Sequence, residues 1–327
     1  MTRRRPSALL SLILLLVAGC GRVRWPSMLS VEPPAFEEAA YAKKRFTAYR
    51  VEPGSDVVGE IRHHRVRKGE SLFEIARWYD LGYNEVVDAN PGVDPLVPPV
   101  GTNVVLPTEW VLPCCTTEGI VVNIPEMRLY QYRRDAEGLT VETYPVGLGR
   151  QGWRTPRGRF AVRTKTVNPR WVVPESIRKE HIRDSGDDRR SIAGGAADNP
   201  LGKYRLALTI RPFSIHGTDI PWGIGMQVTH GCIRLYPEDI ERLFGRVDVG
   251  TPVELTYQPV KAGRRADDVW VEVHKDIYGY AKSPYRAALD ALGQRRLRGA
   301  VDPAALEAAV RTPGGVPFRL PAATRAS

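Results

Sequence analysis

The stretch that most restricts the fold runs from residue 119 to 257, where short β-prone segments follow one another between turns. Two turns have clear chemistry, the polar hairpin over 133–138 and Pro156-Arg157-Gly158. One good helix interrupts the pattern at 237–244, with proline in its first turn and acids at its positive end. The β-prone segments are 120–124, 127–132, 140–146, 159–166, 206–210, 213–215 and 253–257. We therefore expect a mainly β domain over residues 118–257.

A long insertion separates two of these segments, at residues 167–203. Its first half, 174–181, has a helical pattern, and its second half is rich in glycine and aspartate. A long irregular insertion in a compact domain is usually functional or mobile. The insertion is therefore expected to be either functional or mobile.

A histidine and a cysteine, each beside a glycine, stand sixteen residues apart at His216 and Cys232. The segment between them, 219–226, has the proline and glycine content of a loop, and β-prone runs flank the pair. Two neighbouring strands joined by a lid would place both side chains in one cleft. A cysteine nucleophile needs such an arrangement, because the thiolate is the reactive form and a nearby imidazole promotes it.

The residues around the cysteine suggest roles in acyl transfer. His216 is the expected base, and the backbone amides of Gly231 and Cys232 are the expected donors to an oxyanion. Arg234 would share a strand face with Cys232 and hold a substrate carboxylate, unless it is an ordinary surface arginine. His230 is expected to make a structural hydrogen bond.

The alternatives to a nucleophile are a metal ligand and half of a disulfide. A structural zinc site would lack a fourth ligand, so no metal is expected. Cys114 and Cys115 are adjacent, and either a vicinal disulfide or two thiols would suit them. A disulfide from Cys232 to one of them is the structural alternative to a nucleophile.

Residues 63–107 form a separate compact pattern of strand, helix, helix and strand. Ser71 and Glu74 have the spacing of a capping box, and Asn84 is the expected cap of a second helix over 85–89. The module resembles a LysM domain, a family that binds glycans with N-acetylglucosamine, such as peptidoglycan. A structural unit without a ligand is the alternative. The resemblance is carried by Val66, Lys68-Gly69-Glu70-Ser71-Leu72, Ile75-Ala76, Asn90-Pro91 and Val105-Leu106-Pro107.

The N-terminus predicts export. A basic start, an apolar run over 8–18 and small residues describe a signal peptide over 1–19, and the run is too short to span a membrane. Residues 17–20 resemble a bacterial lipobox, which implies that Cys20 is lipidated; an ordinary signal peptide is the alternative. In a bacterium with two membranes, the protein would be an outer-membrane lipoprotein in the periplasm. Residues 20–62 are predicted to be a tether.

The net charge of +10 has no nucleic-acid signature beside it, so an anionic envelope polymer or ordinary solvated surface explains it better. Residues 258–327 are expected to be an extension without chemistry of its own. It has a strand at 268–274, helices at 283–298 and 303–311, and a disordered end.

The sequence around Cys232 resembles the L,D-transpeptidase (YkuD-like) catalytic domain, in the subgroup with periplasmic wall-attaching enzymes. The resemblance covers 118–257 and implies a β-sandwich or barrel-like domain. It rests on His216-Gly217-Thr218, Thr229-His230-Gly231-Cys232-Ile233-Arg234, Val146-Gly147, Gly149-Arg150, Gly152-Trp153, Thr155-Pro156, Gly158, Asn168-Pro169, Trp171 and Asn199-Pro200-Leu201-Gly202.

The resemblance implies a reaction. Cys232 would attack the diaminopimelate carbonyl of a peptidoglycan tetrapeptide and release D-alanine, with no metal or organic cofactor. His216 would move the proton, held by a backbone carbonyl near Gly217 or Thr218, while Arg234 and Trp222 would bind substrate. The acceptor amine would be another diaminopimelate, giving a 3-3 cross-link, or the lysine of a lipoprotein. The alternatives are a hydrolase on the same scaffold, a non-catalytic wall anchor and a generic cysteine peptidase.

Overall fold

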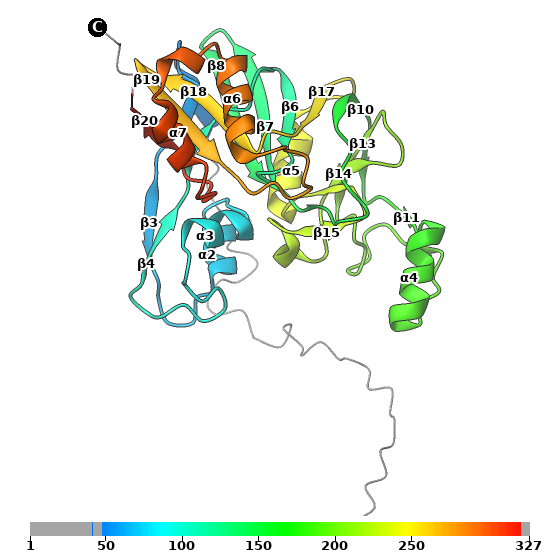
Figure 1. The fold of residues 1–327 in the computed structure, drawn as a ribbon. Coiled ribbons are helices and arrows are strands. Elements are labelled where there is room, and N and C mark those ends of the chain that lie inside the picture. The colour runs from blue at the N-terminus through cyan, green and yellow to red at the C-terminus, as the bar shows by residue number, and fades with distance from the viewer. Residues whose placement is uncertain (1–40, 42–47, 322–327) are drawn as a thin grey trace, which may run out of the picture. The chain divides into compact units, whose positions relative to one another are not determined.

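The computed structural model describes Tyr41 and residues 48–321, and its largest element is a nine-stranded mixed sheet (Figure 1). The strand order is β1-β8-β7-β6-β17-β10-β13-β14-β16. This confirms the mainly β catalytic domain. The strands are β1 (Ala48–Arg50), β6 (Gly119–Asn123), β7 (Arg128–Asp135), β8 (Gly138–Pro145), β10 (Gly158–Val167), β13 (Tyr204–Leu208), β14 (Ser214–His216), β16 (Ile233–Arg234) and β17 (Pro252–Thr256).

Strand β10 joins the two halves of this sheet. Residues 158–161 pair with β17, whereas residues 162–167 pair with β13. The register shifts between Val162 and Thr164, and such an irregularity bends a strand. One long, bent strand can therefore belong to two halves of the sheet that pack against different parts of the core.

Helix α5 (Pro237–Arg246) covers the half of the sheet that carries the histidine and cysteine. Its proline lies in the first turn, as predicted, and Ile240 and Leu243 are buried in the same core as Ile215 and Ile233. The two strands that bear the candidate catalytic residues are thereby fixed from one side by apolar packing.

The N-terminal module has the predicted order of β3 (Arg62–Arg65), α2 (Leu72–Trp78), α3 (Tyr83–Ala89) and β4 (Asn103–Leu106), with β3 antiparallel to β4. The capping box of Ser71 and Glu74 is present. The expected cap at Asn84 is wrong, because α3 begins at Tyr83, two residues earlier than expected, and its N-cap is Gly82. The Asn84 amide instead donates to the carbonyl of Glu126, so a contact to the catalytic domain replaces the local one.

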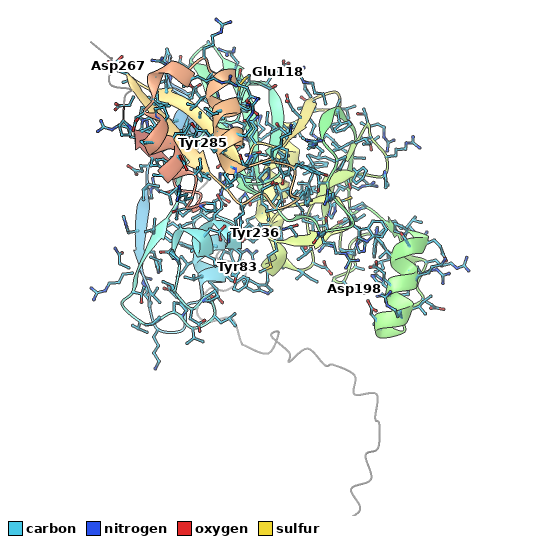
Figure 2. The ribbon with its side chains drawn as sticks, viewed as in Figure 1. Tyr83, Glu118, Asp198, Tyr236, Asp267 and Tyr285 are labelled. Carbon is cyan, nitrogen blue, oxygen red and sulfur yellow. A yellow bond between two sulfur atoms is a disulfide. The ribbon has the colours of Figure 1, made fainter. Side chains whose placement is uncertain are left out.

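The module packs directly against the catalytic domain. Arg77 donates to both carboxylate oxygens of Glu238, at 3.0 and 2.9 Å, and Arg128 does the same to Glu85, at 2.8 and 2.7 Å. All four side chains are buried. Tyr236, labelled in Figure 2, adds a hydrogen bond across this contact, from its Oη to the carbonyl of Leu81 at 3.3 Å. These paired charges make the module and the catalytic domain one packed body.

The predicted tether is only partly correct. The signal peptide, Cys20 and residues up to 40 lie outside the described residues, but β1 pairs with β8 at the edge of the main sheet. A further strand, β2 (Val57–Gly59), pairs with β5 (Glu109–Val111) in the linker. Both strands have three residues and pair with distant segments, so they lack the periodic local pattern that marks a strand. Among the described residues, no helix has the length and apolar character needed to cross a membrane.

The C-terminal extension is a packed unit. Strands β18 (Val260–Arg265), β19 (Asp268–Val273) and β20 (Phe318–Leu320) form a sheet, and α6 (Pro284–Gln294) and α7 (Pro303–Ala309) pack over it (Figure 1). The predicted strand and helices are confirmed. The expected disordered end is wrong for residues 318–320, which complete the sheet, while 322–327 lie outside the described residues.

A buried lysine joins the extension to the catalytic domain. Lys261 Nζ lies 2.8 Å from Glu126 Oε1 and 3.0 Å from Glu272 Oε1, and all three side chains are fully buried. His274 Nε2 lies 2.7 Å from the same Glu272 oxygen. Glu126, Glu272 and His274 have the spacing of metal ligands, but the ammonium of Lys261 already contacts both carboxylates. The cluster is therefore an ion-pair network between two parts of the chain.

Candidate active site

The two strands around the motif are neighbours, as the sequence predicts, and the structure shows that they run parallel. Ile215 pairs with Ile233, and His216 pairs with Arg234. This register brings Ser214 Oγ within 3.7 Å of Cys232 Sγ. His216 and Cys232 line the same cleft, which has a volume of about 390 Å³.

His216 is held in one neutral form. Its ring is 3% exposed, and Nδ1 lies 2.7 Å from the carbonyl of Gly217. A carbonyl only accepts, so Nδ1 carries the proton and Nε2 keeps its lone pair. Burial, together with the charges of Arg234 and Arg205, lowers the pKa of His216 to about 3. At neutral pH the imidazole is therefore able to accept a proton, and Gly217 has the supporting position expected for it.

The insertion forms much of the cleft. It contains β11 (Trp171–Val172), α4 (Glu175–Ser185) and β12 (Ser191–Ile192). The loop over 219–226, expected to be the lid, contributes only Asp219 and Ile220 to the lining. The insertion contributes Trp171, Ile177, His181, Arg189, Ile192, Asp198, Pro200 and Leu201.

A substrate contact for Trp222 stays a prediction. This residue lies in the short helix η2 (Pro221–Gly223) and is absent from the described lining of the cleft. Its ring meets that of Phe73 edge to face, with centroids 6.4 Å apart. Phe73 lies on α2 of the N-terminal module, so Trp222 is used for packing between domains.

Arg234 and Asp219 place one basic and one acidic side chain in the cleft. Both line it, and Arg234 points into the same cleft as Cys232, which excludes an ordinary surface arginine. Burial lowers the pKa of Arg234 and raises that of Asp219. A cation that is poorly solvated gains more from a substrate carboxylate than an exposed one would.

His230 makes a structural contact, as predicted, although sequence reasoning missed its main partner. Its Nε2 lies 2.8 Å from Glu180 Oε2, and Arg150 Nη2 lies 2.5 Å from the same oxygen. The ring of Trp153 packs edge to face on His230 at 5.0 Å. Glu180 belongs to α4, so this contact ties the insertion to the residue beside Gly231. No periodicity in the insertion marks Glu180 for this role.

Removing this contact should weaken substrate binding more than catalysis. We expect Glu180→Ala to raise KM about five-fold with little change in kcat, because a lost contact of ~1 kcal/mol frees α4 from the cleft. Steady-state kinetics of the cysteine-dependent reaction measure both constants. The matched control is Glu175→Ala. Glu175 lies on the same helix and forms an ion pair with Arg178, at 3.0 Å, on that helix. Equal effects of the two substitutions would contradict the prediction.

The turn before the cysteine has the geometry that only glycine adopts easily. Gly231 has a φ of +103°, as its sequence position suggested. Its amide donates to Thr229 Oγ1 at 3.1 Å, and that hydroxyl donates to the carbonyl of Cys232 at 2.6 Å. Of the two amides predicted to bind an oxyanion, that of Gly231 is thus already used. The amide of Cys232 remains the predicted donor.

Cys232 is a free, half-buried cysteine. Cys114 and Cys115 are joined to each other as a vicinal disulfide, so the alternative of a disulfide to Cys232 is wrong. The thiol is therefore available for chemistry.

Comparison with known proteins agrees with this geometry. A family model described as the L,D-transpeptidase catalytic domain matches residues 117–255, and the LysM domain model matches 64–107. The probable L,D-transpeptidase YcfS of Escherichia coli strain K12 is 39% identical over 230 residues, which are 68% of this chain and 71% of the relative. The chain belongs to the L,D-transpeptidase family. It is a transferase with a cysteine-dependent catalytic domain and a LysM domain.

Other relatives agree. The probable L,D-transpeptidase ErfK/SrfK of Salmonella typhimurium is 40% identical over 64% of this chain and 67% of the relative. Likeness to solved structures is weak. The Ldtfm-avibactam carbamoyl enzyme has a TM-score of 0.33 and 22% identity over 46% of this chain and 54% of its own. L,D-transpeptidase 3 of Mycobacterium tuberculosis has a TM-score of 0.32 and 20% identity, over 47% and 67%. Family membership rests on the sequence relatives.

Proposed function

We propose that the protein transfers peptidoglycan stem peptides by an acyl-enzyme route with Cys232 as nucleophile and His216 as proton acceptor and donor. The observation that carries this is the neutral, buried His216, fixed by the Gly217 carbonyl in the cleft that contains the free Cys232. Acyl transfer by a thiol needs no oxidant, metal or organic cofactor.

In the first half-reaction the sulfur bonds to the carbonyl carbon of the diaminopimelate residue, and the thiol proton passes to His216 Nε2. The tetrahedral intermediate then expels the amine of D-alanine, which takes the proton from His216 and leaves the thioester. In the second half, the acceptor amine attacks the thioester and gives a proton to His216, which passes it to the departing sulfur as the amide forms. Arg234 would hold a substrate carboxylate, while the Cys232 amide would bind the oxyanion.

The LysM domain and the N-terminal sequence suggest where in the cell the reaction takes place. The LysM domain supports binding to peptidoglycan glycan, and the pattern ending at Cys20 supports a signal peptide over 1–19 and a lipid anchor in the outer membrane. We therefore place the enzyme in the periplasm, with residues 63–107 on the glycan and 118–257 on the stem. The acceptor is diaminopimelate of a second stem or the terminal lysine of a lipoprotein.

Muropeptide analysis tests this proposal. Tetrapeptide-rich sacculi are incubated with the enzyme, or with enzyme whose Cys232 has been alkylated by iodoacetamide, and the digested products are weighed by mass spectrometry. We expect 3-3 dimers or exchange of D-alanine with the active enzyme only. Net loss of existing links would show that water is the acceptor and would favour the hydrolase. Identical profiles would leave a non-catalytic anchor and overturn the enzymatic proposal. A peptide ending in lysine, added to parallel samples, tests the lipoprotein acceptor.

A further inference from the structure

The peptide unit between Gly231 and Cys232 carries the predicted oxyanion donor at one end and a structural hydrogen bond at the other. Its carbonyl accepts from Thr155 Oγ1 at 3.1 Å, and its N–H is the amide of Cys232. The peptide bond is trans, so the carbonyl and the N–H point in opposite directions. Fixing the carbonyl therefore fixes the direction of the Cys232 N–H.

The hydroxyl of Thr155 makes two hydrogen bonds, so rotation of the side chain would break at least one of them. The residue is 1% exposed, and its Oγ1 also accepts from the amide of Gly149 at 3.1 Å. A hydroxyl has one proton, and here that proton goes to the Gly231 carbonyl. Gly149 ends the short strand β9 (Leu148–Gly149), which pairs with β15 (Gln227–Thr229) just before the catalytic turn.

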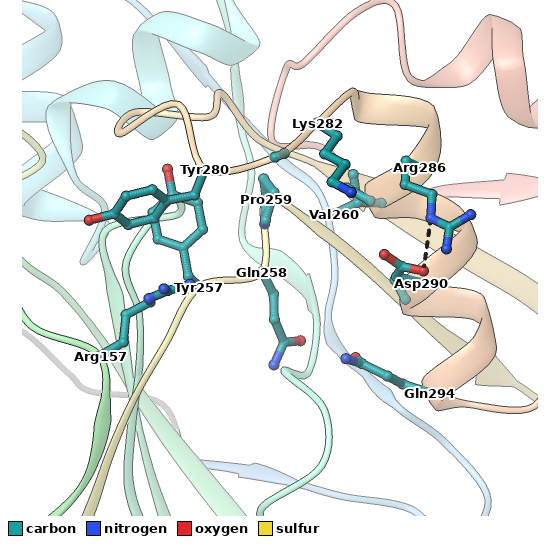
Figure 3. A pocket seen from close by; sticks show the side chains of 13 residues that line it. Arg157, Tyr257, Gln258, Pro259, Val260, Tyr280, Lys282, Arg286, Asp290 and Gln294 are labelled. Carbon is teal, nitrogen blue, oxygen red and sulfur yellow. Dashed lines mark ion pairs between the residues drawn. The ribbon is translucent and has the colours of Figure 1, made fainter.

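The C-terminal extension fixes Thr155 in turn. Tyr278 Oη accepts from the amide of Thr155 at 3.2 Å and donates to the carbonyl of Gly149 at 2.6 Å. Tyr278 is 5% exposed and follows β19, outside the segment that the catalytic-domain model matches. Its own amide donates to Tyr257 Oη at 2.8 Å. Figure 3 shows Tyr257 beside Tyr280 and Arg157, where the catalytic domain meets the extension around a cleft of about 400 Å³.

We propose that Thr155 and Tyr278 are positioning residues that aim the amide of Cys232 at the developing oxyanion, so that the C-terminal extension takes part in catalysis. The inference rests on the proposed function, in which Cys232 forms an acyl-enzyme. Neither side chain touches the substrate. Each acts through the backbone: Tyr278 holds Thr155 and Gly149, and Thr155 holds the peptide unit that carries the donor.

The test compares two reactions of the same thiol. Acylation by a carbapenem passes through an oxyanion, whereas alkylation by iodoacetamide does not, so only the first depends on the aimed amide. Thr155→Val keeps the shape of the side chain and removes the hydroxyl, and Tyr278→Phe removes only Oη. Loss of one oxyanion donor costs about 10²–10³ in rate, and misdirection should cost part of that. We expect Thr155→Val to slow acylation about 10–100-fold and Tyr278→Phe about 3–10-fold. Alkylation rates should stay within about two-fold of the unaltered enzyme, since the thiol itself is untouched.

Tyr280→Phe is the control, because Tyr280 belongs to the same ring cluster but its ring is 39% exposed. It should leave both rates unchanged. Parallel loss of acylation and alkylation in Thr155→Val would mean general disorder of the site and would overturn the inference, as would unchanged acylation. Both results would leave the proposed function intact. Full transfer by enzyme alkylated at Cys232 would instead refute the proposed function.

Discussion

Cys232→Ala should abolish transfer, and His216→Ala should lower its rate by about 10²–10⁴. The first substitution removes the atom that forms the thioester. The second removes the imidazole whose Nδ1 the Gly217 carbonyl fixes, which leaves Nε2 without a proton and able to act as the base. Release of D-alanine from a tetrapeptide and the mass of the acyl-enzyme measure both effects. His181→Ala, another histidine that lines the cleft, is the control and should retain most of the activity. Activity of His216→Ala close to that of the unaltered enzyme would refute the proposed base.

The pH dependence of His216 follows from its surroundings. Because burial and Arg234 lower its pKa to about 3, the imidazole is neutral and basic throughout pH 5–8. Protonation, which removes the base, begins only as the pH falls toward that value. Arg234→Gln removes a nearby positive charge, so it should raise the pKa of His216 and move the acidic limb of kcat to higher pH. A limb that moves to lower pH in this variant would contradict the assignment.

Lys261→Met should lower the free energy of unfolding by about 3–5 kcal/mol, because it leaves Glu126 and Glu272 buried without the ammonium between them. Equilibrium unfolding in urea measures the change. Lys282→Met, an exposed lysine of the same extension, is the control and should change stability by less than about 0.5 kcal/mol. Adding Glu272→Gln to Lys261→Met should recover part of the loss, since one unpaired charge is removed. A loss below about 1 kcal/mol would contradict the buried ion-pair network.

The sequence predicted those parts of the site in which local pattern and tertiary contact agree. The helix at Pro237 has its start signals, the proline and the acids, in its first turn, and the β-prone runs beside His216 and Cys232 are neighbours, as the motif required. The support of His216 near Gly217 came from the family resemblance, and the structure contains it as a hydrogen bond.

The rest depends on partners that are distant in the sequence. Glu180 contacts His230 across fifty residues, and Tyr278 contacts Thr155 across 123. Neither side chain differs locally from an ordinary surface acid or core tyrosine. The sequence could not show that the ring of Trp222, predicted to bind substrate, contacts Phe73 of the N-terminal module. The three-residue strands β1 and β2 were missed for the same reason.

The docking of the LysM domain has a consequence for how the enzyme would act on a polymer. Two buried arginine–glutamate pairs and the contact of Phe73 with Trp222 join this domain to the body that carries Cys232. A binding domain on a flexible linker would let the catalytic domain reach stem peptides over a wide range of distances. Here the distance between the glycan-binding domain and the sulfur of Cys232 would be fixed. The enzyme would therefore react with stem peptides that lie at that distance from the bound sugar.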